Sequence, residues 1–151
     1  MIVIDATDLI AGRLASNVAK KALLGEQVVI VNSENAVISG KKTSLQNYFK
    51  ERYEIGDPFK GPYWQKMPDR MLRRIIRGML PYKQEKGRKA FSKVMCYIGI
   101  PEKFKNNKLE TVKEANVSKM SNIRYQSLKE ISKFLGRKWK HHTFPERENL
   151  L

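Results

Sequence analysis

The first 31 residues alternate between two short β-branched runs and one amphipathic run, and this order restricts the fold more than any other feature of the chain. Residues 1–6 (MIVIDA) and 27–31 (QVVIV) are apolar and β-branched, which is typical of buried strands. Between them, residues 10–23 carry apolar side chains at three- and four-residue spacing, the pattern of a helix with one buried face. Strand, helix and strand in this order predict a βαβ unit with two parallel strands.

Capping residues predict where the first two helices begin and end. Thr7 or Asp8 can cap the start of the first helix, and Gly25 stands where a left-handed C-terminal residue is expected. Thr43 can cap a second helix. The loop before it holds a short predicted strand at residues 37–38.

A third helix is predicted to begin at Pro68, because proline is favourable at the first helical position, and to stop before Pro81. Its apolar stripe comprises Met71, Leu72, Ile75, Ile76, Met79 and Leu80.

The pattern weakens after the third helix. We expect a short helix that is interrupted at Gly87, followed by a buried strand at residues 94–98. Residues 102–124 are polar and weakly patterned. Ser127 and Glu130 form a capping-box pattern that opens a final helix.

Positive charge is concentrated in the second part of the chain. The chain has 30 Lys and Arg against 15 Asp and Glu, a net charge of +15. Residues 1–59 hold seven of each sign, so residues 60–151 hold 23 basic and eight acidic residues and account for the whole excess. A surplus of this size favours a polyanionic partner, either nucleic acid or an anionic membrane. The sequence predicts a neutral scaffold joined to a cationic surface.

Four arginines on the predicted third helix give the strongest binding signal. Arg70, Arg73, Arg74 and Arg77 follow i, i+3, i+4, i+7 spacing, so they share one face, opposite the apolar stripe. A merely solvated face would usually mix Glu with Arg, and guanidinium groups fit phosphate oxygens two at a time. We interpret this face as anion-binding, with a plain solvated surface as the alternative.

Further cations follow the third helix. Over residues 60–93, eleven Lys and Arg stand against two acids and are interleaved with Tyr63, Trp64 and Tyr82. Phosphate contacts supply affinity for RNA, and aromatic rings can stack on unpaired bases. The same rings could instead pack on the core, and for Trp64 the sequence leaves both interpretations open. The cations of this run that we expect to bind RNA are Lys83, Lys86, Arg88 and Lys89.

Two smaller patterns leave alternatives open. Lys41 and Lys42 precede the second helix, whose free N–H groups could hold a phosphate; the Walker spacing is absent, and an ordinary cap fits as well. Near the end of the chain, a basic–aromatic cluster could dock on RNA or stay mobile. Its cations assigned to RNA binding are Arg137, Lys138 and Lys140.

Catalytic and metal-binding residues are sparse. The two histidines are adjacent, the single cysteine Cys96 lies in an apolar run, and the sequence has no Cys/His cluster. Asp5 follows the first strand and could be catalytic, but a turn or capping role is the simpler interpretation. We therefore expect no enzyme activity, no cofactor, no metal and no small-molecule substrate. No run approaches the roughly 18 apolar residues that span a bilayer, so we expect no membrane partner.

Several stretches resemble the large-subunit ribosomal protein L13 family. They are Asp5-Ala6, residues 12–16 (GRLAS), 31–42 (VNSENAVISGKK), 73–91 (RRIIRGMLPYKQEKGRKAF) and 94–101 (VMCYIGIP). The stretch Arg77-Gly78-Met79-Leu80-Pro81 is the most specific. Gly99-Ile100-Pro101 is similar to the archaeal and eukaryotic branch, because the bacterial branch typically has a His-Pro pair shortly after that glycine.

The resemblance implies a three-layer α/β/α single domain around a four-stranded, mostly parallel sheet. The domain would cover residues 1–136, with a C-terminal helical extension and a basic tail at residues 137–151. It implies a cytoplasmic structural constituent of the large ribosomal subunit, which binds rRNA beside neighbouring ribosomal proteins and assists early assembly. The segments favoured as rRNA contacts are residues 77–81 and 83–89, then Lys41 and Lys42, while Arg13 could serve helix packing instead. A free-standing RNA-binding translational regulator is the alternative function.

Overall fold

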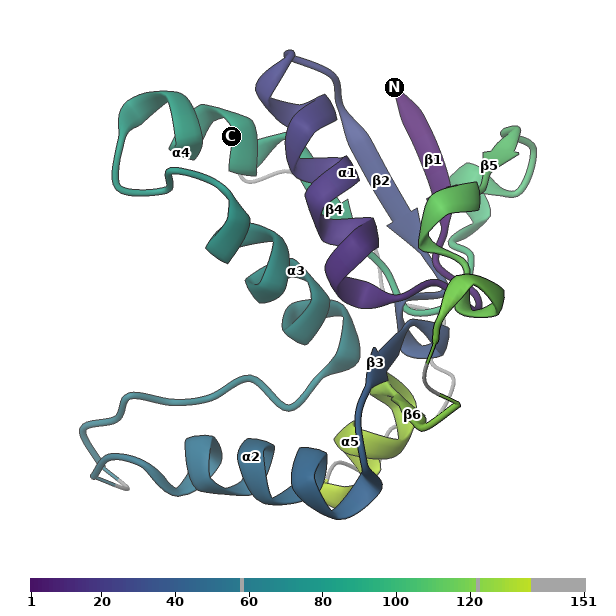
Figure 1. The fold of residues 1–151 in the computed structure, drawn as a ribbon. Helices are drawn as coiled ribbons and strands as arrows, with labels where there is room; N and C mark the ends of the chain where they lie inside the picture. Colours follow the sequence, from purple (N-terminus) through teal and green to yellow (C-terminus); the bar gives the residue numbers. More distant parts are fainter. Residues whose placement is uncertain (58, 122, 137–151) are drawn as a thin grey trace.

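The structure, a computed structural model, describes residues 1–57, 59–121 and 123–136. Its central element is a four-stranded sheet in the order β4-β2-β1-β5, in which every neighbouring pair is parallel (Figure 1). The strands are β1 (Ile2–Asp5), β2 (Val28–Val31), β4 (Val94–Cys96) and β5 (Leu109–Glu110). Helix α1 (Ala11–Leu23) connects β1 to β2, so the predicted βαβ unit is confirmed.

The main hydrophobic core lies on one face of this sheet. There α1 packs against α3 (Pro68–Met79) and α4 (Glu85–Ser92), and α3 also contacts β4 (Figure 1). Side chains alternate between the two faces of a strand, and β2 shows this directly. Val28 and Ile30 belong to the main core, whereas Val29 and Val31 belong to a smaller cluster on the opposite face.

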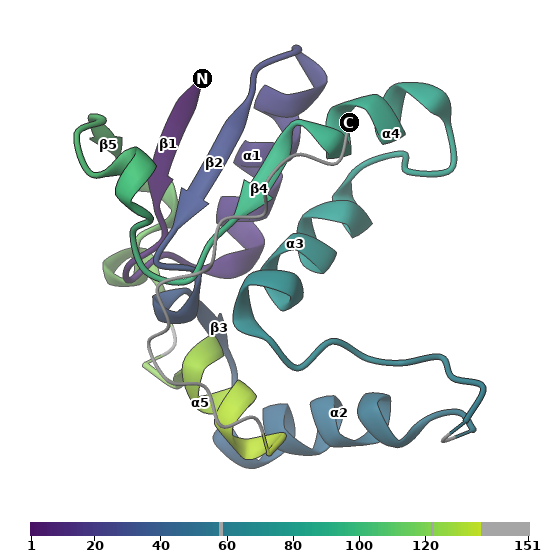
Figure 2. The same cartoon turned by 180° about the vertical axis from the view of Figure 1, so that it is seen from behind.

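The opposite face of the sheet, which Figure 2 shows in front, carries that smaller cluster. Tyr97 and Phe104 pack against it, Phe104 from the 3-10 turn η2 (Glu102–Phe104). A parallel sheet exposes few of its apolar side chains on either face, so both faces need such a cover. The four-stranded sheet and the helices agree with the predicted three-layer α/β/α class.

A second, two-stranded sheet lies beside the first. β3 (Val37–Ser39) pairs antiparallel with β6 (Tyr125–Ser127), and α2 (Lys42–Glu54) and α5 (Leu128–Phe134) lie next to it (Figure 1). Ser127 caps α5 as predicted, because its hydroxyl accepts the Glu130 N–H at 3.3 Å. Through the pairing of β3 with β6, the C-terminal part of the described chain lies beside the segment that follows β2.

The predicted caps of the first two helices are wrong. α1 begins at Ala11 rather than after Thr7 or Asp8, because the Thr7 hydroxyl donates to the Asp5 carboxylate at 2.7 Å and so belongs to the preceding turn. This contact confirms the turn role of Asp5. α2 begins at Lys42, which places Thr43 inside the helix. Gly25 does adopt a left-handed φ of 100° after α1, as predicted.

The end of α3 also departs from the predicted stripe. Met79 is 42% exposed, whereas Leu80 is 4% exposed. The helix stops at Met79, and Leu80 is extended, with φ −102° and ψ 149°. This change of backbone conformation, rather than helical periodicity, turns the Leu80 side chain inward.

Two further strand and helix predictions need correction. Helix α4 runs through Gly87 without interruption, and β4 ends at Cys96 instead of continuing to residue 98. Tyr97 still donates its N–H to Ile30 at 2.8 Å, but the chain then turns through Gly99, whose φ is 63°. β5 and β6 could not be predicted from local patterns, because each is only two or three residues long and has no apolar alternation.

We expect Gly87→Ala to destabilise the fold by about 1–3 kcal/mol or more, since overpacking against fixed atoms forces the backbone apart. A β-carbon at Gly87 would overlap the Pro81 carbonyl group and lie 2.9 Å from the backbone nitrogen of Tyr82. The measurement is urea unfolding followed by far-UV circular dichroism.

Gly78→Ala is the matched control, because a β-carbon at this helical glycine meets no heavy atom within 4 Å. Alanine there should stabilise α3 by about 0.5–1 kcal/mol through its lower backbone entropy in the unfolded chain. Equal stability of the two variants would show that the contact with Pro81 does not constrain position 87.

Candidate nucleic-acid interface

Helix α3 has one buried side and one cationic side. Leu72 and Ile76 have no exposed surface, and burial of a side chain of this size contributes about 1.5–3 kcal/mol. Because these two residues anchor α3, the arginines on its other side are held at fixed positions on the molecule. The helix begins at Pro68, as predicted, and ends before Pro81.

Three of the four predicted arginines lie over aromatic rings. The guanidinium carbon of Arg74 is 3.8 Å from the ring centroid of Trp64. Arg73 lies 4.5 Å from the ring of Phe91, and Arg77 lies 5.1 Å from the ring of Tyr82. These distances fit cation–π contacts, which hold a guanidinium group in place.

The fourth predicted arginine, Arg70, is exposed and donates to the side-chain oxygen of Gln65 at 3.2 Å. Beside it, burial raises the pKa of the Asp69 carboxyl, against the lowering effects of Arg70 and Arg73. Asp69 stands in the first turn of α3, where a carboxylate is favourable near the helix N-terminus.

Helix α2 contributes a cation that the sequence analysis missed. Arg52 lies 4.6 Å from the ring of Tyr48 and 5.4 Å from the ring of Trp64. The first contact could have been predicted, since Tyr48 stands four residues before Arg52 on one helix face. The second depends on the loop between α2 and α3, which no local pattern reveals.

Arg52, Arg74 and Arg77 form a group that we call the arginine cluster. Burial lowers the pKa of Arg74, and the charges of Arg77 and Arg52 lower it further. None of the three takes part in an ion pair within the described residues. Trp64 contacts both Arg52 and Arg74, whereas Arg77 contacts Tyr82, so aromatic rings position these guanidinium groups despite their mutual repulsion.

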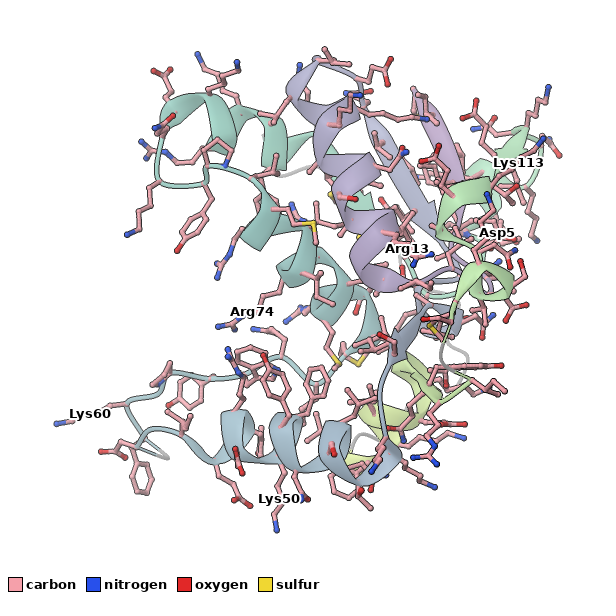
Figure 3. All side chains as sticks on the ribbon, viewed as in Figure 1. Asp5, Arg13, Lys50, Lys60, Arg74 and Lys113 are labelled. Carbon is pink, nitrogen blue, oxygen red and sulfur yellow. The ribbon has the colours of Figure 1, made fainter. Side chains whose placement is uncertain are left out.

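A cleft of about 420 Å³ opens beside the arginine cluster. Figure 3 shows Arg74 extending from α3 into the space above α2. The residues that line the cleft are Tyr48, Glu51, Arg52, Ile55, Pro62, Tyr63, Trp64 and Arg74. Trp64 is partly buried and packs against the main core, which confirms the packing interpretation, and its ring also contacts Arg74. Its stacking on an RNA base stays a prediction.

The predicted cations beyond Pro81 form a separate exposed group around α4. Lys83 precedes the helix, and Lys86, Arg88 and Lys89 lie on it with exposed side chains. The Lys89 ammonium pairs with the Glu85 carboxylate at 2.7 Å, which leaves it less available to bind a phosphate. Because α4 follows α3 directly in space, this group continues from the end of the arginine face (Figure 1).

The remaining predicted residues lie elsewhere. Lys41 and Lys42 are exposed at the start of α2, at the other end of that helix from the cleft loop (Figure 1). Arg13 donates to the Lys119 carbonyl at 3.3 Å, which supports a packing role. The cations of the predicted tail, Arg137, Lys138 and Lys140, lie outside the described residues.

The polar residues considered for catalysis are engaged in the fold. The carboxylate oxygen Oδ1 of Asp5 accepts from Thr7 and from the amide of Asn32 at 3.0 Å. Burial raises the pKa of the Cys96 thiol, which disfavours the nucleophilic thiolate. Among the described residues, no group of three or more His, Cys, Asp or Glu side chains is placed to hold a metal ion. No helix of the described chain is long and apolar enough to cross a bilayer.

Comparison with known proteins identifies the family. The family described as Ribosomal protein L13 matches residues 1–103, about two thirds of the chain. The chain belongs to the ribosomal protein L13 family. The stretch on which the sequence resemblance depended most, residues 77–81, forms the end of α3 and the turn toward α4.

Curated relatives in the L13 family extend this similarity to most of the chain. A large ribosomal subunit protein uL13 from Methanosarcina barkeri is 46% identical over 92% of this chain and 100% of its own length. Proteins of the same name from Methanopyrus kandleri and Archaeoglobus fulgidus are 43% and 42% identical over 89% of this chain and 86% of their own lengths. All three are archaeal, in agreement with the branch predicted from Gly99-Ile100-Pro101.

We expect Arg52→Gln to weaken the salt dependence of folding stability. Repulsion within the arginine cluster opposes folding at low salt, and screening relieves it. Between about 0.02 M and about 0.5 M NaCl, the free energy of unfolding of the wild-type chain should rise by a few tenths of a kcal/mol more than that of Arg52→Gln. This difference is the repulsion energy expected of one like-charge pair. Urea unfolding at the two salt concentrations measures this difference.

Lys50→Gln is the matched control, because Lys50 lies on the same helix, carries the same charge and pairs with Glu54 at 3.8 Å. Its salt dependence should change in the opposite sense or not at all, since screening weakens an attractive pair. Identical salt dependence of folding stability in the two variants would mean that repulsion within the arginine cluster does not lower the stability.

Proposed function

We propose that this chain is a non-catalytic, structural constituent of the large ribosomal subunit and binds rRNA through α3, α4 and the turn between them. The names of its relatives place those proteins in the large ribosomal subunit. The observation that carries the proposal is the arginine cluster, three guanidinium groups from α2 and α3 that lie over aromatic rings and form no ion pair within the described chain. Such a group is suited to a polyanion.

The contacts we assign to rRNA form three sets. The first is the α3 face with Arg70, Arg74 and Arg77, supported by Arg52; Arg73 contributes charge, although its Nε is buried. The second set lies around α4 and comprises Lys83, Lys86, Arg88 and Lys89. The third set comprises Lys41 and Lys42, with Arg137, Lys138 and Lys140 of the basic tail.

The proposed mechanism is electrostatic and structural. The α/β core holds cations at fixed positions, and these bridge phosphates from rRNA segments that would otherwise repel one another. Binding therefore favours the compact rRNA fold, which is the contribution expected of a protein that acts early in assembly. Phosphate contacts position the protein without specifying sequence, so base readout should be slight. In the cytoplasmic ribosome, neighbouring ribosomal proteins would lie beside this chain on the rRNA.

The same geometry would also suit a free-standing RNA-binding translational regulator. The comparisons do not favour that alternative, because the reported relatives are named as subunit proteins. We therefore keep the structural role as the proposal.

We expect Lys86→Glu combined with Arg88→Glu to reduce incorporation into large subunits by about tenfold or more when the variant competes with the wild-type chain, because two phosphate contacts become repulsive. Both side chains are exposed on α4, so the fold should be retained. Tagged variant and wild type are co-expressed, and their ratio is measured in the large-subunit fraction of a sucrose gradient.

Lys105→Glu combined with Lys108→Glu is the charge-matched control. Both lysines are exposed near β5, at the opposite edge of the sheet from β4 and the preceding α4. This variant should be incorporated nearly as well as the wild type. Equal incorporation of the two double variants would contradict the assigned surface.

A further inference from the structure

The cleft beside the arginine cluster has features that a flat phosphate-binding surface does not need. Its volume of about 420 Å³ falls within the range of about 300–1,000 Å³ that is usual for small-ligand sites. One side is mainly cationic, with Arg52 from α2 and Arg74 from α3, although the carboxylate of Glu51 also lines the cleft. The other is apolar, with Ile55, Pro62 and Tyr63 from the segment that joins the two helices.

Within the part of the chain that the structure describes, the guanidinium groups in the cleft are positioned without using their hydrogen-bond donors. Arg52 and Arg74 lie over the rings of Tyr48 and Trp64, at 4.6 and 3.8 Å. A carboxylate partner would occupy the N–H groups of an arginine, whereas an aromatic face contacts its plane and leaves the N–H edge available. That edge is the part of arginine that binds phosphate oxygens in pairs.

The mutual repulsion in the arginine cluster indicates the charge of the missing partner. Arg77 and Arg52 both lower the pKa of Arg74, which is also partly desolvated. An anion between these groups would replace repulsion by attraction, so binding should be coupled to stability. Two guanidinium groups against the single carboxylate of Glu51 leave the cleft lining with a net positive charge, so charge complementarity favours a phosphate between Arg52 and Arg74.

The apolar side is exposed although its side chains are large. Ile55 is 61% exposed and Tyr63 is 63% exposed. The Tyr63 hydroxyl donates to the Phe59 carbonyl at 2.5 Å, which orients the ring while leaving much of its surface open. An oriented, exposed aromatic ring next to a phosphate site is the arrangement used to stack an unpaired base.

We propose that this cleft binds one unpaired nucleotide of rRNA, with its phosphate between Arg52 and Arg74 and its base against Tyr63 and Ile55. This inference rests on the proposed function and adds that the bound RNA is single-stranded at this point. Bases in a duplex are stacked on both faces and cannot enter such a site without being extruded.

The test uses the full chain with Trp139→Phe, which leaves Trp64, a wall of the cleft, as the sole tryptophan. A single-stranded ten-nucleotide uridine RNA and a blunt RNA duplex with the same number of phosphates are titrated, and tryptophan fluorescence and RNA anisotropy are followed together. The single strand should change Trp64 fluorescence, and the duplex should bind with little change.

Three variants separate the cleft from the rest of the cationic surface. Arg52→Gln with Arg74→Gln should abolish the fluorescence change and weaken single-strand binding by about tenfold or more, the effect of losing charge-assisted hydrogen bonds. Lys105→Gln with Lys108→Gln removes the same charge near β5, outside the assigned rRNA contacts, and should keep the fluorescence change. Tyr63→Leu retains both arginines and should remove the preference for the single strand, so it tests the base contact if the double arginine variant fails to fold.

Three results would overturn the inference. Equal fluorescence changes with duplex and single strand would show that the cleft binds phosphate alone. Binding by anisotropy with no Trp64 change, and equal losses in the two double variants, would place the RNA outside the cleft while the proposed function stands. The absence of binding to both RNAs would remove the proposed function together with the inference.

Discussion

The packing of one side of α3 onto α1 and the four-stranded sheet is the interaction on which the cationic surface depends. Leu72 and Ile76 are fully buried there, and the same helix carries four arginines, of which Arg73 has a buried Nε. A flexible segment with equal charge would lose conformational entropy each time it met an RNA. Because burial already fixes α3, its cations are positioned before any phosphate arrives. Core packing thus sets the positions of the cations that we propose to bind phosphates.

Aromatic rings take the place that carboxylates have in many arginine-rich surfaces. Trp64, Tyr82 and Phe91 each support one arginine of α3. The rings restrain the guanidinium groups, but they do not cancel the charge, so the positive potential extends into solvent. The excess of basic residues beyond residue 60 adds to this positive potential. Repulsion within the arginine cluster lowers the stability of the fold, and a bound phosphate would relieve this repulsion.

The sequence predicted the features that depend on local patterns. The βαβ unit, the start of α3 at Pro68 and the cap of α5 at Ser127 are all set by residues close in the chain. It predicted the short strand at residues 37–38, which is β3, but missed β5 and β6, because these strands are short and pair with distant segments. It also missed Arg52, because the contact with Trp64 is made through the loop between α2 and α3. The inward turn of Leu80 depends on where the helix stops, which periodicity does not encode.

The most direct test of the central claim is electron cryomicroscopy of large ribosomal subunits that contain this chain, at a resolution that shows side chains. We expect phosphate oxygens of rRNA within hydrogen-bond distance, about 2.7–3.2 Å, of the guanidinium groups of Arg74 and Arg77. The rings of Trp64 and Tyr82 should remain in contact with those arginines. A subunit in which the α3 arginine face points to solvent, with rRNA bound only elsewhere on the chain, would contradict the claim.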